Sequence, residues 1–379
     1  MSYDIATKCI HLEGVCKDNI YGAVSFPIFQ TATFAHPGVG QSTGYDYSRL
    51  QNPTREQLER IVASLENGYD ALAYSSGMAA IAAVLELFSP GDHLIIEEDL
   101  YGGSVRLFQS ISRKNGLTFT RLDMSREDIE DYITPDTKGI FMETPTNPMM
   151  HVVDIASLAQ VTKSHGLLLI VDNTFLSPYL QNPLNLGADI VIHSGTKYLG
   201  GHNDTLAGFA VTASREISEK LRFQIKTTGA MLAPFDSWLL LRGIQTLPVR
   251  MKAAQENAWR IACWLTKQKH VKKVLYPGLL SHPGHEIMKK QSRGFGAMVS
   301  FEVDSKKYAC SILQKVRLIQ YAESLGGTET LITYPITQTH ADVPKELLKK
   351  NGITEGLLRL SAGIEDTEDL IADLSQAME

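Results

Sequence analysis

The chain has 379 residues, of which 44% are hydrophobic, and a formal net charge of −6 at pH 7. This length predicts one large domain and one smaller domain, and the lack of a basic surplus argues against a nucleic-acid partner. The N-terminus has no signal-peptide pattern, and no stretch reaches the roughly 18 to 20 apolar residues of a membrane helix. We therefore expect a cytoplasmic protein that acts on small molecules, without a membrane partner.

The cysteines predict reduced thiols rather than a disulfide framework or a zinc site. They are spread through the chain without a Cys-x-x-Cys pair, at Cys9, Cys16, Cys263 and Cys310. Such spacing favours packing roles.

Residues 1–45 are predicted to form an extended arm that contacts a partner subunit. This segment is rich in Gly, Thr and aromatic residues and has weak periodicity. Weak periodicity is typical of irregular structure rather than of sheet.

From about residue 70 to 215, short apolar runs alternate with helix-like stretches, which is typical of βα units around a mostly parallel sheet. The run 167–171 (LLLIV) has no polar alternation, as expected for a strand covered on both faces. The expected strands are 92–97, 139–143, 167–172, 190–193 and 208–212, and the expected helices are 78–88 and 155–165. The fold class is therefore α/β, with helices on both faces of the sheet.

The pattern changes near residue 245, which predicts a domain boundary there. A long helical stretch, 248–269, is followed by shorter strands such as 298–303 and by a last helix, 367–377. The predicted organisation is an arm at 1–45, a large cofactor-binding domain at 46–245 and a smaller α/β domain at 246–379.

The strongest local signal for chemistry joins Asp172 and Lys197. Asp172 ends a buried run, and Lys197 follows the next apolar run in the segment 193–197 (HSGTK). A doubly wound sheet places functional groups beyond the carboxyl ends of its strands, so both side chains are expected in one crevice. A Schiff-base lysine and a carboxylate paired with a pyridine nitrogen suit pyridoxal 5'-phosphate (PLP). Taken alone, the two residues also suit a helix cap and a surface lysine.

Two further segments fit the same cofactor. Residues 75–78 (SSGM) offer small residues and free backbone N–H groups for a phosphate at a helix start, and Ser194 and Thr196 can add hydroxyl donors. Tyr101 follows the strand 92–97 and could place its ring on the pyridine face. An ordinary helix cap and simple packing are the alternatives for these segments.

Motifs for other sites do not occur. There is no G-x-G-x-x-G after a strand, no G-x-x-x-x-G-K-[ST] and no H-E-x-x-H. The eleven histidines lack metal-ligand spacing, so no metal is expected. We expect His193 to be a buried, hydrogen-bonded residue.

Together these segments resemble the Cys/Met metabolism family of PLP enzymes. The matching stretches, in the family's order, are 45–49 (YDYSR), 52–54 (NPT), 75–79 (SSGMA), 101–103 (YGG), 143–148 (ETPTNP), 171–174 (VDNT), 193–198 (HSGTKY), 323–327 (ESLGG) and 359–363 (RLSAG). The resemblance implies the type I PLP-dependent transferase fold, which is like that of aspartate aminotransferase. It also implies a homo-oligomer, a homotetramer of two active dimers.

The resemblance implies roles for the cofactor ligands. Lys197 is the Schiff-base lysine, Asp172 the pyridinium partner, Tyr101 the stacking ring and Asn147 a contact to the ring region. The same-chain phosphate ligands are Gly77, Met78, Ser194 and Thr196, and the pair that reaches the neighbouring subunit's phosphate is Tyr47 and Arg49. Each active site would therefore need two chains.

For the substrate, the resemblance implies that Arg359, helped by Ser324, clamps the α-carboxylate. A planar guanidinium can grip a carboxylate with two parallel hydrogen bonds. Without the resemblance, Arg359 also suits a surface ion pair with Glu355 or Glu365.

The implied activity is γ-elimination or γ-replacement on cystathionine or an O-acylhomoserine, as in cystathionine γ-lyase or γ-synthase. Lys197 would move the protons and Tyr101 would assist the leaving thiol. Glu323 resembles the γ-lyase and γ-synthase pattern rather than the β-lyase one, and Gly103 stands where methionine γ-lyases carry a cysteine. Cystathionine β-lyase and methionine γ-lyase activities remain alternatives within the family. Transaminase or decarboxylase activity and a non-catalytic PLP-binding module are the alternatives outside it.

Overall fold

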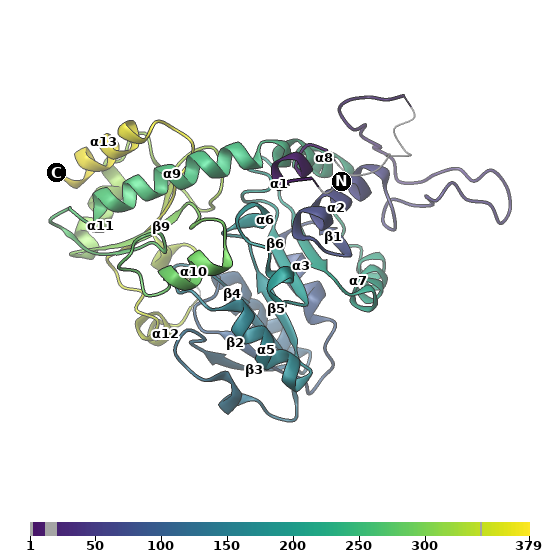
Figure 1. The fold of residues 1–379 in the computed structure, drawn as a ribbon, viewed down its shortest axis with the longest axis horizontal. Helices are drawn as coiled ribbons and strands as arrows, with labels where there is room; N and C mark the ends of the chain where they lie inside the picture. The colour runs from purple at the N-terminus through teal and green to yellow at the C-terminus, as the bar shows by residue number, and fades with distance from the viewer. Residues whose placement is uncertain (1–2, 12–20, 342) are drawn as a thin grey trace.

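The computed structural model describes residues 3–11, 21–341 and 343–379. Its central sheet has seven strands in the order β1-β7-β6-β5-β4-β2-β3, in which only β7 runs antiparallel to its neighbours. These strands are β1 (Asp70–Tyr74), β2 (His93–Glu97), β3 (Thr118–Leu122), β4 (Thr137–Glu143), β5 (Leu168–Asp172), β6 (Ile190–Ser194) and β7 (Gly208–Thr212). The expected mostly parallel α/β sheet is confirmed (Figure 1).

Both faces of this sheet are buried. In β5, Leu169 and Val171 pack in one hydrophobic cluster with residues of α2 and α5, whereas Ile170 packs in a second cluster with residues of α3 and α7. The helices of this part are α1 (Ile5–Lys8), α2 (Pro53–Glu66), α3 (Gly77–Leu85), α4 (Gly102–Leu107), α5 (Ile155–His165), α6 (Ser177–Leu180), α7 (Arg215–Thr228) and α8 (Pro234–Gln245), with short turns at η1 (Phe108–Ser112), η2 (Ile129–Tyr132) and η3 (Pro183–Leu186). Burial on both faces explains the unbroken apolar run of β5.

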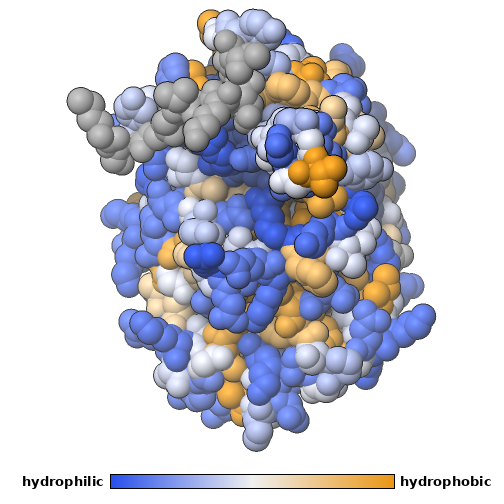
Figure 2. All heavy atoms as spheres, turned by 90° about the vertical axis from the view of Figure 1, so that its right-hand side faces the viewer, coloured by the Kyte–Doolittle hydropathy of each residue, from blue (hydrophilic) through white to orange (hydrophobic). Residues whose placement is uncertain are grey.

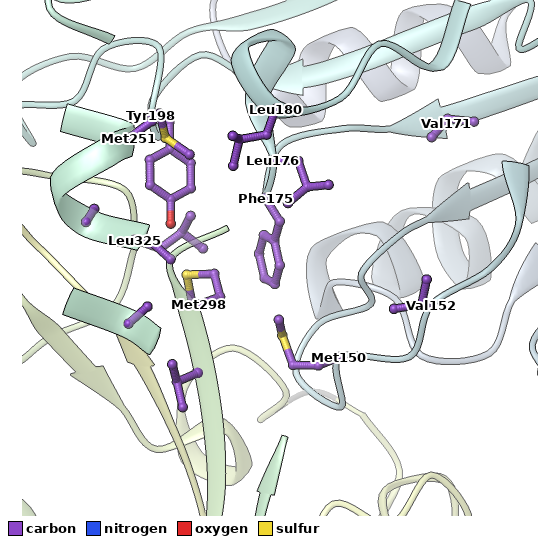
Figure 3. Packing of buried hydrophobic residues seen from close by; sticks show 14 of the residues in the cluster. Met150, Val152, Val171, Phe175, Leu176, Leu180, Tyr198, Met251, Met298 and Leu325 are labelled. Atoms are coloured by element: carbon purple, nitrogen blue, oxygen red, sulfur yellow. The ribbon is translucent and has the colours of Figure 1, made fainter. Parts of the chain in front are cut away.

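A second, five-stranded sheet follows in the order β10-β11-β12-β9-β8. Its elements are α9 (Leu247–Leu265), β8 (Val271–Leu275), α10 (His285–Gln291), β9 (Met298–Val303), α11 (Lys306–Lys315), β10 (Gln320–Tyr321), β11 (Leu331–Thr333), η4 (Pro335–Thr337), α12 (Lys345–Lys350), β12 (Leu357–Ser361) and α13 (Thr367–Met378). One hydrophobic cluster runs from the central sheet into this part, and Figure 3 shows Phe175, Met298 and Leu325 grouped within it. The predicted boundaries at residues 45 and 245 stay predictions.

Capping groups define the helices that flank the site. The Ser76 side chain accepts a hydrogen bond from the N–H of Ala79 at the start of α3, and Asp154 accepts one from Ser157 at the start of α5. These bonds satisfy donors that the first helical turn leaves free. Helix α5 ends at His165 and is capped by Gly166, whose φ of 65° is a left-handed conformation that glycine adopts readily.

Two predicted helices are shorter in the structure. The helix expected at 78–88 ends at Leu85, ahead of Pro90, and the one expected at 248–269 is Leu247–Leu265. After Leu265 the N–H groups of Lys267 and Gln268 bond the carbonyls three residues earlier, so the last turn tightens.

The described part of the N-terminal segment lies outside the sheets. It contains α1, and its Thr33 forms an isolated antiparallel bridge with Tyr47, just beyond the segment. Its contact with a partner subunit stays a prediction. Cys9, Cys263 and Cys310 are free thiols, and Cys16 lies outside the described residues. No helix in the described part of the chain is long and apolar enough to cross a membrane.

Candidate active site

A cavity of about 350 Å³ opens at the carboxyl ends of β4, β5 and β6 and is closed from the second sheet by β12 and the segment 323–325. The predicted site residues that line it are Gly77, Met78, Tyr101, Asn147, Asp172, Ser194, Thr196, Lys197, Glu323, Ser324 and Arg359. As expected for functional groups beyond the carboxyl ends of strands, the fold brings these segments together although they are far apart in the sequence. Tyr47 and Arg49 do not line this cavity in the single chain.

Lys197 reaches across the cavity to the second part of the chain. Its Nζ donates a hydrogen bond of 2.7 Å to the Ser324 hydroxyl. Burial lowers the pKa of Lys197 to about 8, with Arg359 lowering it further and Glu323 opposing the shift. The surface-lysine alternative is therefore wrong, and a much larger fraction of this amine is neutral near pH 8 than in an ordinary lysine.

Asp172 is the last residue of β5, and its carboxylate accepts a 2.9 Å hydrogen bond from the N–H of Thr174. The Thr174 hydroxyl in turn accepts one from the N–H of Ser194. Burial raises the pKa of Asp172, while the bonds from Thr174 lower it. A cationic ring nitrogen beside this carboxylate would favour its charged form.

Arg359 is 1% exposed, so the alternative of a surface ion pair is wrong. Its Nη1 donates to Asn147 Oδ1 at 2.7 Å, and its Nη2 donates to the Ser324 carbonyl at 3.1 Å and the Thr333 hydroxyl at 3.3 Å. Its Nε is buried without a partner among the described residues. Burial lowers the pKa of Arg359 to about 10, which leaves it charged at neutral pH. It is therefore a buried cation that lines the cavity and carries one unpaired N–H donor.

Small residues shape the phosphate side of the cavity. A Cβ built on Gly77 would lie 3.0 Å from the Ser194 Cβ, so the start of α3 and the end of β6 approach closely. The first N–H groups of a helix have no intrahelical acceptor and attract anions. Gly77, Met78, Ser194 and Thr196 could therefore hold a phosphate.

Tyr101 lines the cavity, and its ring lies against Gly103. A side chain at position 103 would displace the ring. A Cβ built on Gly103 would lie 2.4 Å from the Tyr101 ring. Glycine at position 103 therefore leaves the space that the Tyr101 ring occupies.

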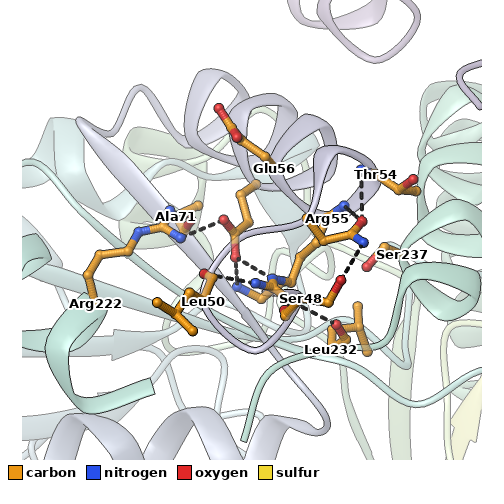
Figure 4. Close-up of polar contacts among 12 residues, drawn as sticks. Ser48, Leu50, Thr54, Arg55, Glu56, Ala71, Arg222, Leu232 and Ser237 are labelled. Carbon is orange, nitrogen blue, oxygen red and sulfur yellow. Dashed lines mark hydrogen bonds and ion pairs between the residues drawn. The ribbon is translucent and has the colours of Figure 1, made fainter. Parts of the chain in front are cut away.

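Tyr47 and Arg49 lie on a segment whose backbone is hydrogen-bonded by the Arg55 side chain. The Arg55 guanidinium donates to the carbonyls of Ser48 at 2.7 Å and Leu50 at 3.0 Å, on either side of Arg49 (Figure 4). The Arg49 guanidinium carbon lies 5.5 Å from the centre of the Tyr47 ring. The segment is thus anchored although these two residues do not face their own chain's cavity.

Glu143 was not among the predicted site residues. It ends β4 directly beside Asp172, lines the cavity and accepts a 2.8 Å hydrogen bond from the N–H of Asn147. Burial raises its pKa well above the usual range, and Asp172 and Asp99 add to the shift. Its position at a strand end was the signal that could have identified it. Thr339, another lining residue, lies in an irregular segment without such a signal.

His193 is buried and lies 2.6 Å from Glu66, as expected of a hydrogen-bonded structural residue. The described residues contain no group of three or more His, Cys, Asp or Glu side chains that could hold a metal ion. The cavity combines an amine of lowered pKa, the partly buried Asp172 carboxylate and an anion cradle, and this donor set fits PLP.

Comparison with known proteins agrees with this donor set. Residues 6–379 match the family of Cys/Met metabolism PLP-dependent enzymes. The chain is 50% identical to cystathionine gamma-lyase of Bacillus subtilis (98% of both chains) and 49% identical to cystathionine beta-lyase of Lactococcus lactis (99% of both chains). A solved cystathionine gamma synthase of Xanthomonas oryzae, in complex with aminoacrylate and cysteine, aligns with a TM-score of 0.97 at 40% identity, over 100% of this chain and 98% of that one. The chain therefore belongs to the Cys/Met metabolism PLP-dependent enzyme family.

Proposed function

We propose that this PLP-dependent enzyme of sulfur amino acid metabolism catalyses γ-elimination or γ-replacement on cystathionine or an O-acylhomoserine. The observation that carries the proposal is the convergence of Lys197, Arg359 and Glu323 on one cavity. Glu323 also lines an adjoining groove of about 810 Å³, which leaves room for a long substrate chain.

In this proposal Arg359 binds the α-carboxylate, helped by Ser324, and so orients the Cα–H bond. PLP, when bound, supplies an electron sink for the negative charge that develops on the substrate. Lys197 takes the proton from Cα, and its lowered pKa suits a base that works near neutral pH. Tyr101 assists as acid or base at the leaving thiol.

The remaining contacts hold the cofactor. Asp172 pairs with the ring nitrogen, Asn147 contacts the ring region and Tyr101 stacks on the ring. The phosphate ligands are Gly77, Met78, Ser194 and Thr196 of one chain, together with Tyr47 and Arg49 of a neighbouring chain.

A shared site requires a homo-oligomer, for which we propose a homotetramer of two active dimers. Figure 2 shows apolar residues exposed between polar ones on the side where the N-terminal segment and α7 lie. Leu206 and Phe223 are both 64% exposed and Phe235 is 53% exposed in the single chain. A partner subunit that covered these side chains would remove their apolar surface from water.

Glu323 supports cleavage of the γ-carbon–sulfur bond rather than of the β-carbon–sulfur bond. Its carboxylate can pair with the distal ammonium of L-cystathionine and hold the chain so that the γ-carbon–sulfur bond aligns for cleavage. Cystathionine β-lyase is the second candidate, because a β-lyase is 49% identical to the chain and a γ-lyase 50%.

Incubation with L-cystathionine separates these candidates when the oxoacid is identified by mass spectrometry. With water consumed, γ-elimination gives cysteine, 2-oxobutyrate and ammonia, which is the expected result. Pyruvate with homocysteine as the main products would assign β-lyase activity instead. Turnover only of an O-acylhomoserine plus cysteine would keep the γ-chemistry and identify a synthase.

A further inference from the structure

Asp99 lies just beyond β2 and joins two loops at the edge of the active site. It is 2% exposed, and its Oδ2 accepts a 2.5 Å hydrogen bond from the Thr146 hydroxyl and a 3.0 Å bond from the N–H of Met149. Thr146 and Met149 bracket Asn147, on the loop that follows the neighbouring parallel strand β4. Asp99 Oδ2 therefore accepts hydrogen bonds from Thr146 and Met149, the two ends of the turn that carries Asn147.

Asn147 holds one end of the Arg359 guanidinium, and Ser324 and Thr333 hold the other end. Asn147 Oδ1 accepts the 2.7 Å bond from Arg359 Nη1, while its backbone N–H donates to Glu143. His340 Nε2 lies 3.1 Å from the Asn147 carbonyl on the other side. With Nη1 held by Asn147 and Nη2 held by Ser324 and Thr333, the unpartnered Nε of Arg359 keeps a fixed orientation. A small shift of Asn147 would rotate the planar guanidinium and misalign its donors.

We infer that Asp99 is a positioning residue for carboxylate recognition, acting through the Thr146–Met149 turn and Asn147 on Arg359. The inference rests on the proposed function, because it takes Arg359 to bind the substrate α-carboxylate. It adds a residue that lines a different cavity, of about 150 Å³, and that does not line the active-site cavity.

The hydrogen bonds predict which substitutions preserve this role. Both bonds end on Oδ2, and the N–H of Met149 can only donate, so Oδ2 acts as an acceptor. Burial raises the pKa of Asp99 to about 7, and an acid protonated on Oδ1 would keep both bonds. Asp99→Asn can place its amide oxygen at the same point, whereas Asp99→Ala removes the acceptor.

Binding of two small amines to the PLP-loaded protein tests the inference, followed by the visible absorbance of the cofactor. Glycine carries a carboxylate and methylamine does not. We expect Asp99→Ala to weaken glycine binding about 10-fold, the scale of a lost hydrogen-bonded support, and to leave methylamine binding unchanged. Asp99→Asn should retain glycine affinity. The matched control is Asp123→Asn, because Asp123 lines the same 150 Å³ cavity but bonds Ser125 instead of the turn.

An unchanged glycine affinity in Asp99→Ala, or an equal loss for both amines, would overturn the inference. Arg359→Ala separates it from the proposed function. If Arg359→Ala keeps the preference for glycine over methylamine, the carboxylate clamp itself is wrong. If Arg359→Ala loses that preference while Asp99→Ala keeps it, only the role of Asp99 is wrong.

A second pair of variants covers the case in which Asp99→Ala does not fold. Thr146→Val removes one donor to Asp99 and leaves the Met149 bond, and Thr146→Ser keeps the hydroxyl. Thr146→Val should weaken glycine binding relative to Thr146→Ser, without a difference for methylamine. Equal glycine affinities in this pair would count against the inference.

Discussion

The Lys197 amine donates a 2.7 Å hydrogen bond to the hydroxyl of Ser324, a residue 127 positions further along the chain. Ser324 has a φ of 103°, a conformation that residues with a side chain rarely adopt. The segment after β10 is thus bent sharply to bring a hydroxyl onto the lysine of the central sheet. Strained backbone of this kind persists where the surrounding structure holds it.

The positive φ of Ser324 predicts different stabilities for two substitutions that both remove the hydroxyl. Ser324→Gly should be more stable than Ser324→Ala by about 1 kcal/mol, because glycine tolerates positive φ. Urea unfolding of the two variants measures the difference. The control is Glu86, exposed with a φ of −70° at the end of α3, where alanine should be the more stable replacement. A less stable Ser324→Gly would contradict the conformation.

The lowered pKa of Lys197 predicts how the cofactor-free protein captures PLP. A lysine amine attacks an aldehyde only when neutral, so the capture rate should rise with pH around a midpoint near 8 instead of the ordinary 10.5. Glu323→Gln should move the midpoint lower, because Glu323 raises the pKa of Lys197. A midpoint near 10.5 in rate measurements would reject the burial argument.

The same shift affects stability. Between about pH 8 and 10.5 the unfolded chain binds more protons at Lys197 than the folded chain does. The contribution of Lys197 to the free energy of unfolding therefore rises with pH over this interval.

Arg55, which hydrogen-bonds the backbone on either side of Arg49, pairs with Glu59, so a substitution of Glu59 should lower the free energy of unfolding strongly. Glu59 lies between Arg55 and Arg222, at 3.6 Å and 2.6 Å, with its side chain 3% exposed. Glu59→Leu leaves the buried Arg55 charge without an ion pair, whereas Arg222 keeps its pair with Asp70, and the loss should cost about 3 kcal/mol of unfolding free energy. Glu219→Leu, which breaks the exposed pair with Arg215, should change the urea midpoint little. Equal urea midpoints for the two variants would show that the buried ion pairs of Glu59 stabilise the fold no more than the exposed pair of Glu219 does.

The proposed sharing of each site between two chains predicts complementation. Arg49→Ala should weaken PLP retention in folded protein, because a charge-assisted phosphate contact is lost. Mixing Arg49→Ala with Lys197→Ala subunits should restore part of the activity, since one site of a mixed dimer keeps both residues. Lack of recovery despite demonstrated subunit exchange would argue for sites built from single chains.

The sequence predicted those features that depend on a single local segment, such as one strand and the residue at its end. Strand β5 follows from an unbroken apolar run, and Asp172 and Lys197 follow from the rule that strand ends carry function. Strand β1 was missed because its alanines give a weak strand signal. Strand β3 was missed because it lies at the sheet edge and is only partly buried.

Tertiary packing decided what the sequence could not predict. Arg359 lies on a buried strand, but its guanidinium is oriented by groups from other segments: the Asn147 side chain, 212 residues away, the Ser324 carbonyl and the Thr333 hydroxyl. The closeness of Gly103 to the Tyr101 ring and the junction at Asp99 also depend on how neighbouring loops meet. Periodicity carries no information on such contacts.

The most direct test of the account asks which lysine carries the cofactor. The PLP-loaded protein is reduced with borohydride, digested and mapped by mass spectrometry, with Lys163→Ala, an exposed position on α5, as the control variant. The account predicts that the cofactor remains on the peptide containing Lys197, that Lys163→Ala is labelled in the same way, and that Lys197→Ala is unlabelled and slower in turnover by roughly three or more orders of magnitude. Label on another lysine, or near-normal turnover in Lys197→Ala, would contradict it.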